Sequence, residues 1–321
     1  MDFYLILNVV FAFYVAWIIG SNNQSMAPVT GSGFRSLTVI SLAGGVSSLL
    51  GTIFIGKNVE STIGEGIIVG KISSVEALIV LFSITAWITF ASYKGWPTSS
   101  THSAVGATVG LGLVTLGSGG VQWEKLTLII SAWALTPLIG LSAGYFLTVY
   151  INHVLKNYVK GLGGIVKVSK LSAYALFTLA CLTSFLSGGN DVGNATAFIN
   201  PTINIDAVFL RGFMGIGMLL GLIMLGRRVL FTVGVELVEL TPISGLASLL
   251  STSLVMLVAN FYGLPLSNSQ ILVSSVVGTG LANKRYINLE KIIRIFITWV
   301  ATFVTTALLC SVLYLGFKHF S

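Results

Sequence analysis

Gly20-Ser-Asn-Asn23 recurs later in the chain as Gly188-Gly-Asn-Asp191, and Gly95-Trp-Pro97 recurs as Gly263-Leu-Pro265. Each pair of motifs is separated by 168 residues. Two unrelated short motifs rarely repeat with one common offset by accident, and a shared offset is the mark of an internal repeat. The chain therefore consists of two copies of one unit, with both motifs at equivalent places in each copy.

The composition predicts an all-α integral membrane protein that crosses the cell membrane several times. Of the 321 residues, 8% are charged and 55% are hydrophobic, whereas a soluble protein carries roughly 25% charge. Most of the ten apolar stretches approach the length of about 20 residues that crosses a bilayer as a helix. These stretches are 3–20, 36–56, 75–93, 100–116, 127–150, 171–187, 206–226, 242–262, 266–283 and 291–317.

The net charge of +7 is spread between apolar segments and forms no dense basic run with interleaved aromatic residues. We therefore expect no nucleic-acid partner, and the lipid bilayer is the expected surrounding. The basic clusters are Lys156–Lys170, Arg227/Arg228 and Lys284/Arg285. If all ten segments cross, these clusters fall on one side, which the positive-inside rule makes cytoplasmic, and both termini face outward.

The repeat predicts two inverted halves, 1–150 and 171–321, joined by a cytoplasmic linker over 151–170. Each half has five apolar segments in the same order, and an odd number forces the second half to enter from the opposite side. A third match supports the repeat, since Lys57–Gly64 resembles Arg227–Gly234 with an offset of 170. Inverted repeats with a site at their interface are typical of transporters.

The first motif predicts a helix that is broken inside the membrane. Glycine followed by asparagine or aspartate is a poor helix interior. A break presents carbonyl oxygens to a small cation and free N–H groups to an anion. Asp191 is the one acidic residue within either asparagine-rich break, and an ionisable residue at membrane depth indicates a functional site.

The second motif, Pro97-Thr-Ser-Ser-Thr-His102, is matched by Pro265-Leu-Ser-Asn-Ser-Gln270. Proline followed by hydroxyl residues is typical of a capped helix start. Many hydroxyl and N–H donors together would bind an oxyanion without a tight ion pair. Because Gln270 takes the place of His102, the symmetry requires no proton relay there, and we expect His102 to be a hydrogen-bonding core residue.

These residues resemble a known family. Gly188–Ala195 is nearly the Gly-Ala-Asn-Asp-x-Ala-Asn-Ala signature of the inorganic phosphate transporter (PiT) family, and Gly95–His102 is similar to its Pro-x-Ser-(Ser/Thr)-Thr-His element. The similarity extends over essentially the whole chain. It implies a symporter with a central oxyanion site made of broken helices, coupled to sodium or protons and needing no cofactor.

The resemblance also implies site residues. Those expected to bind the oxyanion are Asn22, Asn190, Ser99, Ser100, Thr101, Ser267, Asn268 and Ser269. Those expected to couple the cation are Asn23, Ser25, Asp191 and Asn194, with Asn23, Asn190 and Asp191 as sodium ligands.

The sequence departs from the family pattern at two positions of the first half. Asn23 stands where the family has aspartate, and Met26 stands where it has its second asparagine. One cation, or protonation of Asp191, then fits better than two sodium ions. A carboxylate favours an anion that carries a proton, as hydrogen phosphate does and sulfate does not. The loss of one carboxylate therefore relaxes selection against sulfate or thiosulfate, which is the alternative substrate class.

Two other classes of protein compete with a symporter. An anion channel is compatible with the inverted repeat. An intramembrane hydrolase built on Ser99, His102 and Asp191 is disfavoured, because the hydroxyl cluster is duplicated while the histidine and aspartate are not.

Two structural questions stay open, namely whether some segments form re-entrant hairpins and whether the glycine face at 106–112 packs within the chain or in a homodimer.

Overall fold

The computed structural model describes residues 3–199 and 205–320, and within these ranges the protein is helical, with two isolated β-bridges and no strand. The helices of the first half are α1 Phe3–Ser21, α2 Ala27–Ser32, α3 Leu37–Ile55, α4 Lys57–Gly66, α5 Ser74–Lys94, α6 Ser100–Leu116, the short 3-10 helix η1 Gly117–Gly120 and α7 Trp123–Tyr158. Those of the second half are α8 Gly161–Asp191, α9 Gly193–Thr196, α10 Ala207–Leu225, α11 Arg227–Phe231, the π-helix η3 Thr232–Glu236, α12 Pro242–Phe261, α13 Asn268–Ala282 and α14 Leu289–Phe320.

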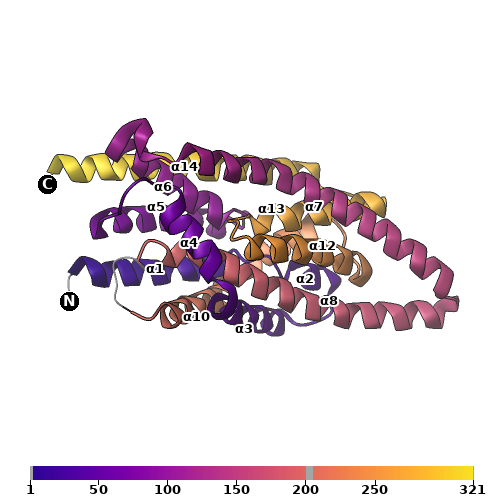
Figure 1. The fold of residues 1–321 in the computed structure, drawn as a ribbon. Helices are drawn as coiled ribbons and strands as arrows, with labels where there is room; N and C mark the ends of the chain where they lie inside the picture. The colour runs from indigo at the N-terminus through magenta and orange to yellow at the C-terminus, as the bar shows by residue number, and fades with distance from the viewer. Residues whose placement is uncertain (1–2, 200–204, 321) are drawn as a thin grey trace.

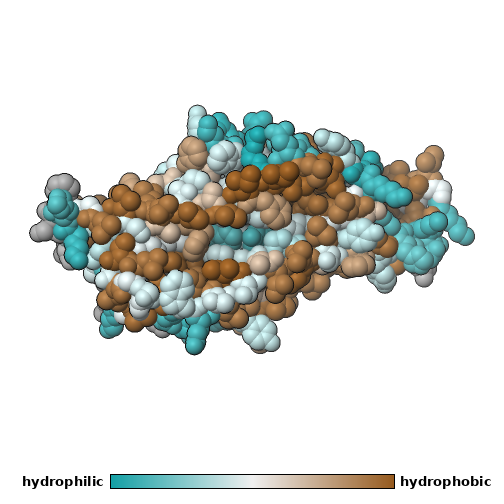
Figure 2. All heavy atoms as spheres, turned by 90° about the horizontal axis from the view of Figure 1, so that it is seen from above, coloured by the Kyte–Doolittle hydropathy of each residue, from teal (hydrophilic) through white to brown (hydrophobic). Residues whose placement is uncertain are grey.

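The predicted all-α membrane architecture is confirmed. Nine helices within the described ranges are long and apolar enough to cross a bilayer. They lie along a common direction (Figure 1). Apolar side chains cover much of the flank of the bundle, while hydrophilic side chains gather at the end where α7 meets α8 (Figure 2). The protein is therefore a multi-pass membrane protein.

The two halves carry the same elements in the same order. The isolated bridge between Ile68 and Val121 in the first half has a counterpart between Val238 and Ile287 in the second. Likewise α4 follows α3 after a single bend, as α11 and η3 follow α10. The internal repeat seen in the sequence is thus a repeat of structure.

The repeats do not form two separate bodies, because their helices interleave. Helix α7 of the first half packs on α12 and α13 of the second, and α14 of the second half packs on α5 and α6 of the first. Helix α3 packs on α8 and α10, and α10 also packs on α1. Each repeat therefore completes the packing of the other.

Helices α5 and α6 form a hairpin that enters the bundle and turns back. Near the turn, Trp87 of α5 and Thr98 both hydrogen-bond to Thr302 of α14. Further from the turn, Ser83 of α5 and Leu111 of α6 both contact Cys310 of the same helix. The two arms therefore run in opposite directions from a tip at residues 95–99.

Helices α12 and α13 form the equivalent hairpin. Ser275 of α13 donates to the Ser248 carbonyl at 3.1 Å and to the Ser251 hydroxyl at 2.8 Å, so the arms lie antiparallel on either side of a tip at residues 262–267. Helix α13 has 15 residues, fewer than the roughly 20 needed to cross a bilayer. The expected segment 266–283 is thus the returning arm of a hairpin and is shorter than a full span.

The stretch 151–170, expected to be a linker, is helical except near Val159 and Lys160. Helix α7 continues to Tyr158 and α8 begins at Gly161, whose φ of 69° lies in the left-handed region that suits glycine. The two long helices meet in a tight turn at one end of the molecule (Figure 1). The cytoplasmic location of this turn stays a prediction.

The glycine face at 106–112 packs within the chain. A Cβ on Gly106 would lie 2.5 Å from the Phe303 carbonyl oxygen, and one on Gly110 would lie 2.2 Å from that of Ala307. Both contacts are with α14, so these glycines let α6 and α14 approach closely. A homodimer, if formed, would use another surface, and it stays a prediction.

The crossing of α1 and α10 gives a stability prediction. A Cβ on Gly221 would lie 1.7 Å from the Trp17 carbonyl oxygen. Overpacking of this kind costs about 1–3 kcal/mol, so Gly221→Ala should lower the melting temperature in detergent. Gly316→Ala is the matched control, since nothing lies within 4 Å of its Cβ. Equal melting temperatures for the two variants would contradict the close crossing of α1 and α10.

Candidate functional site

The first broken helix is held to a hairpin tip by the side chain of Asn22. Helix α1 ends at Ser21, and the Asn22 amide donates to the Ser92 hydroxyl at 3.2 Å and to the Trp96 carbonyl at 3.1 Å. Its oxygen accepts from the backbone N–H of Thr98 at 3.2 Å. Asn22 therefore fixes the tip of the α5–α6 hairpin.

Asn190 does the same in the second half. Its amide donates to the Asn260 side-chain oxygen at 3.3 Å and to the Leu264 carbonyl at 3.1 Å. Asn260 and Leu264 are the repeat equivalents of Ser92 and Trp96. The repeated Gly-x-Asn motif thus places one asparagine beside each hairpin tip. We call Asn22 and Asn190 struts, because their side chains hold the tips by hydrogen bonds.

The two hairpin tips start helices whose N-termini border one cavity. Ser99 caps α6 by accepting from the His102 N–H at 3.2 Å, and Ser267 caps α13 by accepting from the Gln270 N–H at 3.3 Å. Free N–H groups and the helix dipole make each N-terminus attractive to an anion. The cavity is lined by Ile19, Asn22, Asn23, Gln24, Thr98, Ser99, Ser100, Asp191, Ser267, Asn268 and Ser269.

The cavity is small. Its volume is about 20 Å³, which is room for about one water molecule. An oxyanion would therefore enter only if the hairpin tips or the broken helices separate.

Asp191 links the two halves at this cavity. Its Oδ1 accepts from the Ser100 hydroxyl at 2.8 Å, and its Oδ2 accepts from the Ser187 hydroxyl at 3.0 Å. The side chain is buried, and no lysine, arginine or histidine pairs with it in the described part of the chain. A buried carboxylate without a cationic partner is costly, so this position favours a bound cation or proton.

Several buried polar atoms near the breaks have no hydrogen-bond partner within the described ranges. They are the Asn23 amide nitrogen, the Gln24 side-chain oxygen, the Asn268 side-chain oxygen, the Asn190 side-chain oxygen and both side-chain polar atoms of Asn194. Unpaired buried polar groups each cost about 1–3 kcal/mol. Their concentration beside Asp191 and the hairpin tips is the arrangement expected of a site that takes polar or charged ligands.

Eight of the twelve predicted site residues line the cavity, namely Asn22, Asn23, Ser99, Ser100, Asp191, Ser267, Asn268 and Ser269. The other four, Ser25, Thr101, Asn190 and Asn194, do not line it. Ser25 accepts from the Asn268 amide at 3.2 Å, and Thr101 donates to the Leu266 carbonyl at 3.3 Å. These two connect the parts of the site, whereas Asn190 braces a tip.

Sequence reasoning missed Gln24, Thr98 and Ser187. Gln24 donates to the Asn22 oxygen at 3.3 Å, and all three lie within or next to the quoted motifs. Adjacency to the motifs was the signal that could have found them.

His102, expected to be a core residue, has its Nδ1 3.2 Å from the Trp299 carbonyl, and its ring packs on Trp133 at 3.8 Å between centroids.

A bundle of two structural repeats that spans the membrane, with two hairpin tips around a buried polar cavity, is an arrangement found in transporters. The model of the phosphate transporter family matches residues 19–310, and the chain belongs to that family. This membership confirms the resemblance to phosphate transporters and the expectation that the chain is not an enzyme.

Similar proteins agree with this family. A solved structure titled "The sodium-dependent phosphate transporter" has a TM-score of 0.85 and 26% identity, and the match covers 99% of both chains. A Thermococcus kodakarensis protein named "Putative phosphate permease" is 27% identical over 98% of both chains. The chloroplastic inorganic phosphate transporter 2-1 of Arabidopsis thaliana is 26% identical over 91% of this chain and 68% of its own length.

The two asparagine struts give a local prediction. Asn22→Ala removes the side-chain bonds to Ser92, Trp96 and Thr98, so amide hydrogen exchange should accelerate about tenfold or more at residues 95–99, since each lost buried bond costs about 1 kcal/mol or more. Asn190→Ala should accelerate exchange at 262–267 instead. Each variant is the control for the other, and uniform acceleration at both tips in either variant would refute the strut role.

Proposed function

We propose that the protein is a secondary active symporter that moves inorganic phosphate across the membrane with sodium or protons by alternating access. The observation that carries this proposal is the contact of Asp191 with Ser100 between two helix N-termini. This contact brings the hydroxyl and N–H donors of the hairpin tips, which we call the anion cradle, into one buried cavity with a carboxylate that attracts cations.

The anion cradle would be formed by the tips of both hairpins. Ser99 and Ser100 come from the first half, and Ser267, Asn268 and Ser269 from the second. Hydroxyl and N–H donors bind an oxyanion without the full charge of lysine or arginine. We infer that this keeps binding weak enough for release.

The carboxylate of Asp191 would bind the coupling ion. Phosphate and a bare carboxylate repel, so the anion binds well only when a cation or a shared proton offsets the charge. Sodium is favoured because the similar solved transporter is named as sodium-dependent and because the unpaired amide oxygens of Asn190 and Asn194 are hard ligands of the kind that small cations prefer. One cation suits the single acidic residue.

Alternating access would follow from the inverted repeat. The cavity between the tips has a volume of about 20 Å³, which is too small for an oxyanion, so transport needs one tip to separate while the other stays in place. The interleaved packing of α7 and α14 on opposite hairpins gives each tip its own support. A channel would instead need an open path past both tips at once.

Sulfate or thiosulfate is the second candidate substrate class. Asn23 lines the cavity in place of the family's aspartate. With one carboxylate fewer, an anion that carries no proton meets less repulsion. Phosphate is the substrate that family membership supports best.

Asp191→Asn should reduce gradient-driven phosphate uptake to the level of protein-free liposomes, because the amide cannot hold a sodium ion or a proton by charge. Asp206→Asn is the matched control, since Asp206 is the N-cap of α10, outside the cavity. Uptake by Asp191→Asn at the wild-type rate under a sodium or proton gradient would remove the residue from coupling.

Ser100→Ala and Asn268→Ala should each raise KM for phosphate about tenfold, because a hydrogen bond to a charged group contributes about 1.5–3 kcal/mol. Ser61→Ala, which removes an exposed hydroxyl of α4, should leave KM unchanged. If KM stays constant in both site variants, the hairpin tips do not bind the anion.

Uptake into proteoliposomes tests the whole proposal. Phosphate and sulfate are each supplied with a sodium gradient, with a proton gradient and with neither. Saturable, gradient-driven phosphate uptake with counterflow supports a phosphate symporter. Gradient-driven sulfate uptake alone transfers the proposal to the second substrate class, and non-saturable flux without counterflow indicates a channel.

A further inference from the structure

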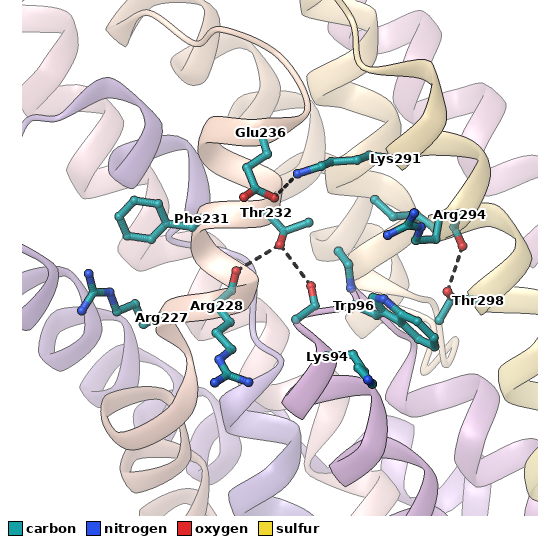
Figure 3. A pocket seen from close by; sticks show the side chains of 13 residues that line it. Lys94, Trp96, Arg227, Arg228, Phe231, Thr232, Glu236, Lys291, Arg294 and Thr298 are labelled. Atoms are coloured by element: carbon teal, nitrogen blue, oxygen red, sulfur yellow. Dashed lines mark hydrogen bonds and ion pairs between the residues drawn. The ribbon is translucent and has the colours of Figure 1, made fainter.

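A second cavity lies on the far side of the first hairpin tip from the central cavity. Its volume is about 630 Å³, and five basic residues line it, namely Lys94, Arg227, Arg228, Lys291 and Arg294. Figure 3 shows Lys94, Arg228, Lys291 and Arg294 around Trp96, whereas Arg227 extends from α11 away from it, and the five residues come from α5, α11 and α14. We call this cavity, defined by these five residues and the tip Gly95–Pro97, the basic vestibule.

The hairpin tip forms a thin wall between the vestibule and the central cavity. Gly95, Trp96 and Pro97 line the vestibule, while the next residues, Thr98–Ser100, line the central cavity. On the vestibule side, Thr232 of η3 donates to the Gly95 carbonyl at 3.1 Å. Movement of this one tip would therefore join the two cavities.

The charge of the vestibule is only partly neutralised. Lys291 pairs with Glu236, and Arg294 pairs with Glu290 at 2.9 Å. Among the residues that the structure describes, no carboxylate pairs with Lys94, Arg227 or Arg228. Their like charges repel across a concave surface, and such a surface raises the local concentration of anions.

The internal repeat shows that this charge is not required by the architecture. By the repeat offsets of 168 and 170, Tyr262 stands at the position of Lys94 and Asn58 at that of Arg228. By the offset of 166 that relates the bridge residues Val121 and Ile287, Leu128 stands at the position of Arg294. At the equivalent positions of the first half, two basic residues remain, namely Lys57 at the position of Arg227 and Lys125 at that of Lys291. A purely structural role would be expected in both copies, so we infer that Lys94, Arg228 and Arg294, which have no basic equivalent, serve one face of the transporter.

We propose that the basic vestibule is a second binding site for inorganic phosphate or a similar oxyanion, through which the anion reaches the central cavity from the α11 face. The arginines offer planar donors that match phosphate oxygens, and the wide cavity leaves the anion partly hydrated. This proposal rests on the proposed transport function. It adds a site that the anion occupies before it enters the central cavity.

The test compares phosphate transport from the two faces. The variant Lys94→Gln/Arg227→Gln removes two charges that form no ion pair with a carboxylate among the described residues. Lys57→Gln/Lys125→Gln is the matched control, because it removes the repeat equivalents of Arg227 and Lys291 at the opposite face. Initial rates are measured against phosphate concentration in right-side-out and inverted vesicles, at low and high salt.

The vestibule variant should raise KM from the α11 face on the order of tenfold at low salt, with less effect at high salt. KM from the other face should not change, which also shows that the variant is folded. The control variant should leave KM from the α11 face unchanged. Equal KM values for wild type and vestibule variant at that face, in a protein that transports phosphate, would overturn the vestibule site alone.

Two further measurements separate free phosphate from lipid and binding from transport. Vesicles of phosphatidylcholine alone and of phosphatidylcholine with phosphatidylglycerol distinguish free phosphate from a lipid headgroup, since an effect limited to the anionic vesicles would overturn the proposal. Equilibrium binding of labelled phosphate in phosphatidylcholine nanodiscs needs no transport. It should show a salt-sensitive class of sites in wild type that is lost in the vestibule variant, and its presence in both would also overturn the proposal.

Discussion

Interrupted helices inside a membrane leave backbone groups that water cannot reach, and the rest of this structure depends on how these groups are satisfied. Each unpaired group in hydrocarbon costs several kcal/mol. Here the end of α1 and the end of α8 each lie against a hairpin tip. Asn22 and Asn190 donate hydrogen bonds there to the carbonyls of Trp96 and Leu264. The polar ends that remain face one another around a cavity. The same constraint therefore holds the fold together and creates a polar site within the bilayer.

The architecture is symmetric but the chemistry is not. Both halves supply a strut and a capped helix, whereas Trp133 and Trp299 both donate to the second hairpin, at the Pro265 carbonyl and the Ser269 hydroxyl. The carboxylate at Asp191 and the charge of the basic vestibule occur once each. Symmetry explains how two similar conformations become available to one chain, whereas the asymmetric residues would decide which ion is coupled and from which face anions are drawn.

The sequence predicted the repeat, the membrane class and eight residues of the cavity, because short motifs with a shared offset report equivalent positions directly. It left the hairpins open, because hydropathy records apolar length and not direction, so the 15-residue α13 looked like a span. It assigned ligand roles to Asn22 and Asn190, which stay predictions, and it did not predict that their amide groups donate to hairpin carbonyls. The offset predicted that they are equivalent, but only the packing of α1 on α5 and of α8 on α12 shows which atoms they meet.

The most direct measurement is the position of a bound oxyanion. Crystals of the protein grown with sodium and arsenate, a phosphate analogue, would locate the arsenic atom by its anomalous scattering. The account predicts a peak between Ser100 and Asn268, with Asp191 beside it and both hairpin tips in contact. Arsenic peaks found only away from the two tips, with the cavity at Asp191 unchanged, would contradict it.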